Sequence, residues 1–139
     1  MRGRSQQRKV NDARFPREEK LKLRNRISHL FEHGRRFSQG PMQVLWMPSP
    51  WPLERGIQVL VGAPKRRFKL AVDRNRVKRL LREAYRLERG NRLDGAEPVI
   101  IGFLYQGKMP VQLSALRGHM AEAIMKVAAH SSKGDQSLA

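Results

Sequence analysis

The side chains whose chemistry stands out are cations, and they are concentrated between residues 65 and 86. That stretch holds ten Lys or Arg residues and two acids, a net charge of 10 − 2 = +8. In its second half, Val77, Leu80, Leu81 and Ala84 recur at steps of three and four residues, which places them on one face of a helix. The cations then occupy the opposite face, where a row of like charges favours a polyanionic ligand. A merely solvated face is the alternative, although such faces usually alternate in sign.

No group of residues in the sequence has the spacing of a catalytic or metal site. His29 and His33 stand four residues apart on a predicted helix, but the HExxH pattern and a third ligand are both missing. The carboxylates of Glu18 and Glu19 fit the favourable electrostatics at the start of a helix better than an acid–base pair. No serine lies in a nucleophile motif, and there is no glycine-rich loop of the nucleotide-hydrolase type. Any chemistry is therefore expected from a partner.

The composition indicates a basic chain that binds nucleic acid. The chain has 139 residues and a formal net charge of +17, so nucleic acid is the leading class of partner and an anionic membrane surface is the next. No run of eighteen apolar residues occurs and the N-terminus has no apolar signal segment, so we expect neither a bilayer-spanning helix nor secretion. The lack of cysteine excludes disulfides and thiolate zinc sites, and it is compatible with a reducing cytoplasm.

The apolar pattern predicts one α/β or α+β domain at residues 14–130, with a mixed sheet packed on helices. A flexible basic arm, 1–13, precedes this domain, and a disordered polar tail, 131–139, follows it. The strand before the basic helix and the strand after it can pair in parallel across that helix. Helices are expected at 17–33, from about Asp73 through the basic segment, and at 113–129; strands are expected at 41–47, 57–63 and 98–105, with room for one more.

Particular residues mark the ends and faces of these elements. Asp73 is the predicted N-cap of the basic helix, and Gly34 is the residue expected just after the first helix. Gly62, inside an apolar strand, indicates a bulge or a close backbone approach. The predicted core stripes are Leu23, Ile27, Leu30 and Phe31 in the first helix, and Leu113, Leu116, Met120, Ala123, Ile124 and Val127 in the last.

The basic helix also resembles a known family. Residues 74–82 read Arg-Asn-Arg-Val-Lys-Arg-Leu-Leu-Arg, which is similar to the signature helix of the protein component of bacterial ribonuclease P. The segments LFEHGRRF (30–37) and FLYQGK (103–108) resemble the family's first helix with its turn and its late strand. The resemblance covers about residues 15–130. The loop at 48–56, with Trp51 and three prolines, has no place in it.

The resemblance implies an αβββαβα fold with a mixed four-stranded sheet and a left-handed crossover through the basic helix, against the general right-handed rule. It also implies the small subunit of a ribonucleoprotein that removes the 5′ leader of precursor tRNA. The RNA subunit would carry the catalytic site and most of the Mg²⁺. The expected partners are therefore ribonuclease P RNA and precursor tRNA, in the cytoplasm, with no membrane, no obligate protein partner and no metal site on the protein itself.

Two RNA-binding surfaces follow from the resemblance. The first contacts the catalytic RNA, where guanidinium groups bind phosphates, lysines add charge and the Asn75 amide bonds a base edge or sugar hydroxyl. The second is a cleft between the first helix and an exposed sheet face, in which aromatic rings stack on bases of the single-stranded leader. The first surface comprises Lys65, Arg66, Arg67, Lys69, Arg74, Asn75, Arg76, Lys78, Arg79, Arg82 and Arg86; the second comprises Phe15, Ile27, Phe31, Phe37 and Trp46, with core packing as the alternative for Ile27 and Phe31.

Two other functions share this charge pattern. One is a ribosomal or other structured-RNA-binding protein with no role in cleavage. The other is a DNA-binding module that places the basic helix in a major groove. Net charge does not separate the three, whereas the block at residues 74–82 favours the ribonuclease P protein.

Overall fold

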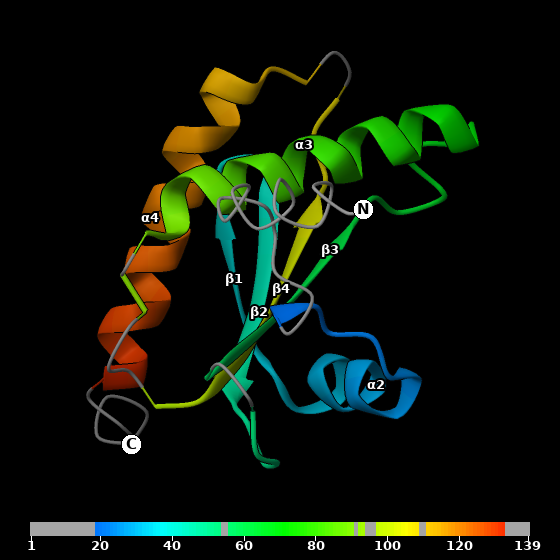
Figure 1. The fold of residues 1–139 in the computed structure, drawn as a ribbon. Coiled ribbons are helices and arrows are strands. Elements are labelled where there is room, and N and C mark those ends of the chain that lie inside the picture. The colour runs from blue at the N-terminus through cyan, green and yellow to red at the C-terminus, as the bar shows by residue number, and fades with distance from the viewer. Residues whose placement is uncertain (1–18, 54–55, 91, 94–96, 109–110, 133–139) are drawn as a thin grey trace, which may run out of the picture.

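The computed structural model describes residues 19–53, 56–90, 92–93, 97–108 and 111–132. Their element order is the αβββαβα order that the resemblance implies, which confirms the predicted α+β class (Figure 1). No helix in these ranges is both long and apolar enough to cross a membrane. The elements are α2 (Arg24–His33), β1 (Arg35–Gln39), β2 (Met42–Pro48), β3 (Ile57–Gly62), α3 (Ala71–Arg89), β4 (Val99–Tyr105) and α4 (Leu113–Ser132).

The four strands form one mixed sheet in the order β1-β2-β4-β3. β1 and β2 make an antiparallel hairpin that turns at Gly40, where a φ of 58° favours glycine. β2 pairs antiparallel with β4, with Trp46 opposite Ile101, and β3 pairs parallel with β4, with Val59 opposite Ile101. β3 is therefore an outer strand, and its free edge faces the chain segment that precedes α2.

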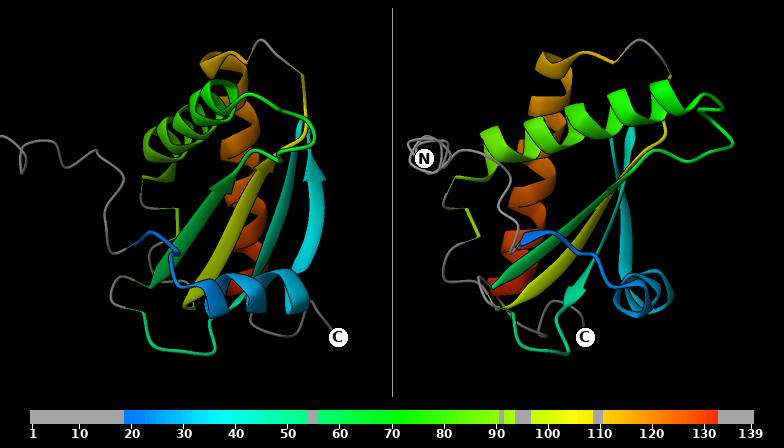
Figure 2. Two further views of the ribbon diagram at one scale, coloured as in Figure 1. Left: turned by 90° about the vertical axis from the view of Figure 1, so that its right-hand side faces the viewer. Right: turned by 45° about the vertical axis from the view of Figure 1, so that its right-hand side comes forward.

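The parallel strands β3 and β4 are joined through α3, and the connection is left-handed. Seen from the side of α2, β3 lies to the left of β4 and both strands run upward (Figure 2, left). The buried face of α3 packs on the opposite side of the sheet, together with α4. Right-handed crossovers are the rule for such units, so this hand is a specific feature that the resemblance predicted.

Helices cover the two faces of the sheet unequally. α3 and α4 pack against each other on one face, where Leu81 and Ile124 belong to the main core. α2 crosses the other face near one end of the strands, and its Leu30 packs on Leu45 and Ile100 in a smaller core (Figure 2). We call this second side the α2-side face. Its other end has no described helix over it, and the side chains of Gln43 and Leu104 there are half-buried, so part of the sheet surface stays accessible.

The described helix that corresponds to the first predicted one, α2, begins at Arg24, and residues 20–23 are not helical, so the prediction of a helix at 17–33 was wrong over these residues. Residues 19–23, which we call the strap, run beside β3: Glu19 is in a 3₁₀ turn, and residues 20–23 continue without helical structure. The Leu21 N–H donates to the Val59 carbonyl oxygen (2.9 Å), and Lys20 forms a parallel bridge with Val59. Hydrogen bonds to the edge of β3 thus replace the helical bonds that local sequence favoured.

Smaller differences occur at other boundaries. β1 has little apolar alternation, and the sequence analysis left room for a further strand without placing it. α3 begins at Ala71, so Asp73 lies in its first turn and Leu70 is the N-cap, with no side-chain capping bond. α4 includes residues 131 and 132, which we predicted as tail. The arm at 1–13, the rest of the tail and Glu18 lie outside the described residues.

Candidate nucleic-acid interface

α3 has one buried side and one cationic side. Val77, Leu81, Ala84 and Tyr85 have no exposed surface and belong to the main core. The predicted binding residues lie on the helix surface or in the turn before it, all exposed except Arg74, Lys78 and Arg86, which are half-buried. Eight of them have no side-chain hydrogen bond or ion pair to any described residue: Lys65, Arg66, Arg67, Lys69, Arg76, Lys78, Arg79 and Arg82. Together with Asn75, these side chains present a surface of unpaired donors.

Two of the predicted binding residues are engaged within the protein. The Arg74 guanidinium donates to the carbonyl oxygens of Phe68 (2.7 Å) and Lys69 (3.0 Å), so it supports the turn that leads into α3. Arg86 forms an ion pair with Glu83, in which its Nε lies 3.2 Å from Oε1. The hydrogen bond from Arg86 lowers the pKa of Glu83, and the same bond raises the pKa of Arg86. Their charges are therefore less available to a ligand than those of the other eight.

The strap is fixed to α3 by a buried polar contact. Glu19 is 1% exposed, and its Oε1 accepts hydrogen bonds from the Tyr85 hydroxyl (2.7 Å) and the Arg89 Nε (3.2 Å). Burial raises the pKa of Tyr85 well above its usual range, and the Glu19 charge raises it further. The hydroxyl therefore stays protonated and keeps donating to the carboxylate. This contact and the Leu21 backbone bond hold the strap between α3 and β3.

The predicted stripe of α2 is only partly buried, which leaves apolar surface beside the open sheet. Leu30 is fully buried and Ile27 packs on the smaller core, but Phe31 is 37% exposed and Leu23 is 55% exposed. Ile27 and Phe31 lie one turn apart on the same flank of the helix. Leu60 of β3 is half-buried on the same side of the sheet. The structure thus brings Ile27 and Phe31 together at one edge of the α2-side face.

Two residues predicted for the leader cleft do not lie there. Trp46 is 3% exposed and belongs to the main core, where its ring centroid is 5.8 Å from that of His130 in α4. Phe37 also packs on that core, under the Nζ of Lys126, which is 5.4 Å from the ring centroid. Because side chains alternate along a strand, both rings point to the side of α4. The prediction for these two was wrong, and Phe15 lies outside the described residues.

The α2-side face carries other side chains of the same strands, which alternate with those that face the main core. Leu45 of β2, Leu60 of β3 and Leu104 of β4 pack on or beside the smaller core. None of these three leucines was among the predicted binding residues. The alternation along β3 is a signal that could have located this face. Buried Ile57, Val59 and Val61 alternate there with half-buried Gln58, Leu60 and Gly62. An added Cβ at Gly62 would lie 2.7 Å from the Leu104 side chain, a close approach of the predicted kind.

The loop after β2 packs on the far flank of α2. The Arg26 guanidinium lies 4.6 Å from the ring centroid of Trp51, and the His29 ring meets Trp51 edge-on at 5.6 Å. The His29 and His33 rings are 4.5 Å apart, in contact with each other. Within the described ranges, no group of three or more His, Cys, Asp or Glu residues is placed to hold a metal ion.

Comparison with known proteins gives a consistent result. A family model described as Ribonuclease P matches residues 15–123. A "Ribonuclease P protein component" from Porphyromonas gingivalis is 42% identical over 71 residues, which are 51% of this chain and 52% of the relative. A protein of that name from Desulfovibrio desulfuricans is 30% identical over 84% of this chain and 88% of its own. The match thus spans about half the length of the first of these relatives and most of the second.

Solved structures agree in fold. The RNase P protein from Thermotoga maritima has a TM-score of 0.63 at 19% identity, covering 78% of this chain and 96% of its own. The RNase P protein of Staphylococcus aureus has a TM-score of 0.60 at 15% identity, covering 82% of this chain and 97% of its own. At these identities the likeness establishes a shared architecture.

Proposed function

Because the chain belongs to the ribonuclease P protein family, we propose that it is the protein subunit of a ribonucleoprotein endonuclease that removes the 5′ leader from precursor tRNA. In this proposal the catalytic centre is on the RNA subunit, and the protein binds that RNA and the leader of the substrate. It acts in the cytoplasm, and no other protein is required. The alternatives of a purely structural RNA-binding protein and of a DNA-binding module lack the family match.

The observation that carries the proposal is the set of eight unpaired cations on α3 and the turn before it. A folded RNA offers a dense array of phosphates, and each cation that meets one releases a condensed counterion. Arginine binds phosphate through two parallel N–H groups, and most of the α3 cations are arginines. The single amide in this row, Asn75, is exposed and can donate to and accept from a base or a 2′-hydroxyl.

The open part of the α2-side face supports the second binding role. Phe31 is 37% exposed on α2, and Ile27, one turn before it, is partly buried against the smaller core. Unpaired bases stack on such surfaces, at about 1–3 kcal/mol per base for an aromatic platform. We propose that Phe31 and Ile27 contact the single-stranded leader here. Phe37 and Trp46 face the main core on the other side of the sheet, so the proposal does not include them.

Magnesium belongs to the RNA in this proposal. When bound, Mg²⁺ activates water and stabilises the leaving oxygen in phosphodiester hydrolysis. The described residues do not fit such an ion, because they include no cluster of three or more potential ligands. The protein's own contribution is therefore to neutralise phosphates and to hold RNA strands in place.

The proposed function is tested by adding the purified protein to a bacterial ribonuclease P RNA at a low Mg²⁺ concentration and measuring cleavage of precursor tRNA. We expect stimulation of cleavage at the mature 5′ end, because the cations replace part of the screening that Mg²⁺ otherwise provides. The protein alone should cleave nothing. A protein that binds the RNA without stimulating cleavage would favour the structural alternative, and hydrolysis by the protein alone would contradict the proposal.

Contact with the leader is tested separately with Phe31→Ala. Its control is Met125→Ala, which removes an apolar side chain that is more exposed (56% against 37%) from α4, on the other side of the molecule. We expect the Phe31 variant to lower the affinity of the holoenzyme for substrates with a leader by about fivefold or more, the lower end of the stacking range. Affinity for the RNA subunit should change little. Equal effects of the two substitutions would remove Phe31 from the leader path.

A further inference from the structure

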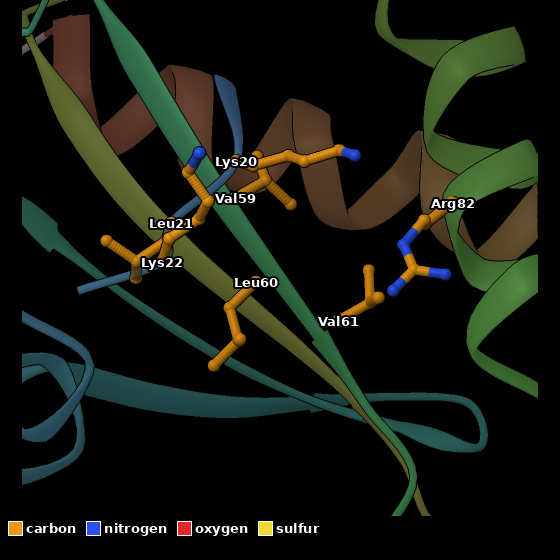
Figure 3. A pocket seen from close by; sticks show the side chains of 7 residues that line it. All are labelled: Lys20, Leu21, Lys22, Val59, Leu60, Val61 and Arg82. Atoms are coloured by element: carbon orange, nitrogen blue, oxygen red, sulfur yellow. The ribbon is translucent and has the colours of Figure 1, made fainter. Parts of the chain in front are cut away.

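A pocket of about 150 Å³ lies at the outer edge of β3, between the strap and α3 (Figure 3). Its walls carry three cations, Lys20 and Lys22 from the strap and Arg82 from α3, and no acid is among the lining residues. Its floor is apolar and includes Leu60 and Val61 of β3. Arg82 reaches from α3 toward Val61, and Lys20 extends from the strap toward α3 (Figure 3).

The three cations are available to a ligand. All three are exposed, and none forms a side-chain hydrogen bond or ion pair with a described residue. Arg86, one turn after Arg82, shows the contrast because Glu83 neutralises it. Like charges gathered without a counter-charge repel one another, so an anion that enters the pocket lowers the free energy of this arrangement.

The strap is held in place by contacts that do not involve the three cations of the pocket. Glu19 is buried against Tyr85 and Arg89, and Leu21 is bonded to Val59, so the residues on either side of Lys20 are fixed. Glu19 thus acts as a positioning residue, which keeps two strap lysines beside an arginine of α3. A preorganised cluster of this kind loses little entropy when it binds an anion.

The pocket also lies between the two proposed RNA-binding surfaces. Val59 and Val61 point to the side of α3, where they join the main core, whereas Leu60 points to the α2-side face. An RNA strand that continues from α3 to the α2-side face therefore crosses the edge of β3 at this pocket. The volume is several times the roughly 10–15 Å³ that one water molecule requires, so a phosphodiester group fits.

We propose that Lys20, Lys22 and Arg82 form a phosphate subsite, which binds one backbone phosphate of an RNA strand passing from α3 to the α2-side face. The inference rests on the proposed function and adds a defined subsite to it. The phosphate comes either from the catalytic RNA or from the leader of precursor tRNA, and the two arms of the test separate these sources.

The test uses Arg82→Gln and Lys20→Gln in the assembled holoenzyme. The matched control is Arg35→Gln, which removes one exposed, unpaired charge from β1, at the opposite edge of the sheet. One arm measures the affinity of each protein for ribonuclease P RNA over a range of salt. The other arm measures the affinity of the holoenzyme for precursor tRNA as the leader is lengthened. Urea unfolding of each variant confirms that the fold is kept.

If the subsite binds the catalytic RNA, both pocket variants weaken binding of that RNA by about tenfold, with a salt slope lower by about 0.7–0.9. If the subsite binds the leader, the affinity of the pocket variants for ribonuclease P RNA stays near that of the control. In that case the holoenzyme no longer gains affinity for precursor tRNA as the leader is lengthened. Pocket variants that match Arg35→Gln in both arms would overturn the subsite. That failure is distinct from failure of the proposed function, in which the wild-type protein does not stimulate cleavage.

Discussion

Replacing Arg76 and Arg79 together with glutamine should weaken binding of ribonuclease P RNA and flatten its dependence on salt. Both side chains are exposed on α3 and neither is paired with a described residue. Eight such cations are present on α3 and the turn before it. At about 0.7–0.9 per neutralised phosphate, eight contacts give a slope of log affinity against log salt of about −6 to −7. Removing two contacts should reduce the size of that slope by about 1.4–1.8.

The assay is a titration of labelled RNA at several KCl concentrations between about 0.1 and 0.4 M, where screening is already strong. The matched control is the double variant Glu83→Gln with Arg86→Gln, which removes a pair and leaves the net charge unchanged. We expect the control to keep a slope close to that of the wild type. Equal slopes for all three proteins would refute the reasoning, because they would show that α3 does not neutralise phosphates.

Three further predictions concern the scaffold. Tyr85→Phe removes a hydrogen bond to buried Glu19, so urea unfolding should show a loss of about 1–3 kcal/mol. The hydrogen bond from Arg117 (2.5 Å) lowers the pKa of Glu88 below its ordinary value of 4.5. The ion pair therefore stabilises the fold at pH values above 4.5, and this stability is lost as the pH falls through the lowered pKa. Glu88→Gln should therefore show a smaller loss of unfolding free energy between about pH 6 and pH 3. Gly34→Ala should lower the free energy of unfolding by about 1–3 kcal/mol, because the added Cβ would lie 2.5 Å from a backbone carbonyl oxygen. Gly118→Ala, where the added Cβ meets open space within α4, should raise the free energy of unfolding by about 0.5–1 kcal/mol. A stabilising Gly34→Ala, an unchanged Tyr85→Phe or a pH profile of Glu88→Gln identical to the wild type would each contradict the corresponding argument.

The sequence predicted the parts of the fold whose signal is local. Periodicity located α3, α4 and the apolar strands because their buried faces repeat at the helical or strand period. The choice of Val77, Leu81 and Ala84 as the buried side of α3 was correct, which also places the cations outside. The hand of the crossover came from the resemblance alone, since local sequence carries no information about it.

Long-range contacts explain what the sequence could not show. Residues 20–23 have good helical composition, but the backbone bond to Val59 and the burial of the adjacent Glu19 against Tyr85 hold this segment beside β3 instead of in a helix. Trp46 was assigned to the leader cleft by rough correspondence with the family, as an aromatic residue that suits base stacking. Its strand register, which only the pairing of β2 with β4 fixes, turns it into the main core. A shift of one residue in register reverses the face of every side chain, so this error was of a predictable kind.

The most direct measurement of the central claim is site-specific cross-linking of the protein to ribonuclease P RNA. The chain has no cysteine, so Arg79→Cys on α3 and Met125→Cys on α4 each give one attachment point for a photoreactive label. The account predicts cross-links to the RNA from position 79 and none above background from position 125. Cross-links from position 125 with none from position 79 would contradict it.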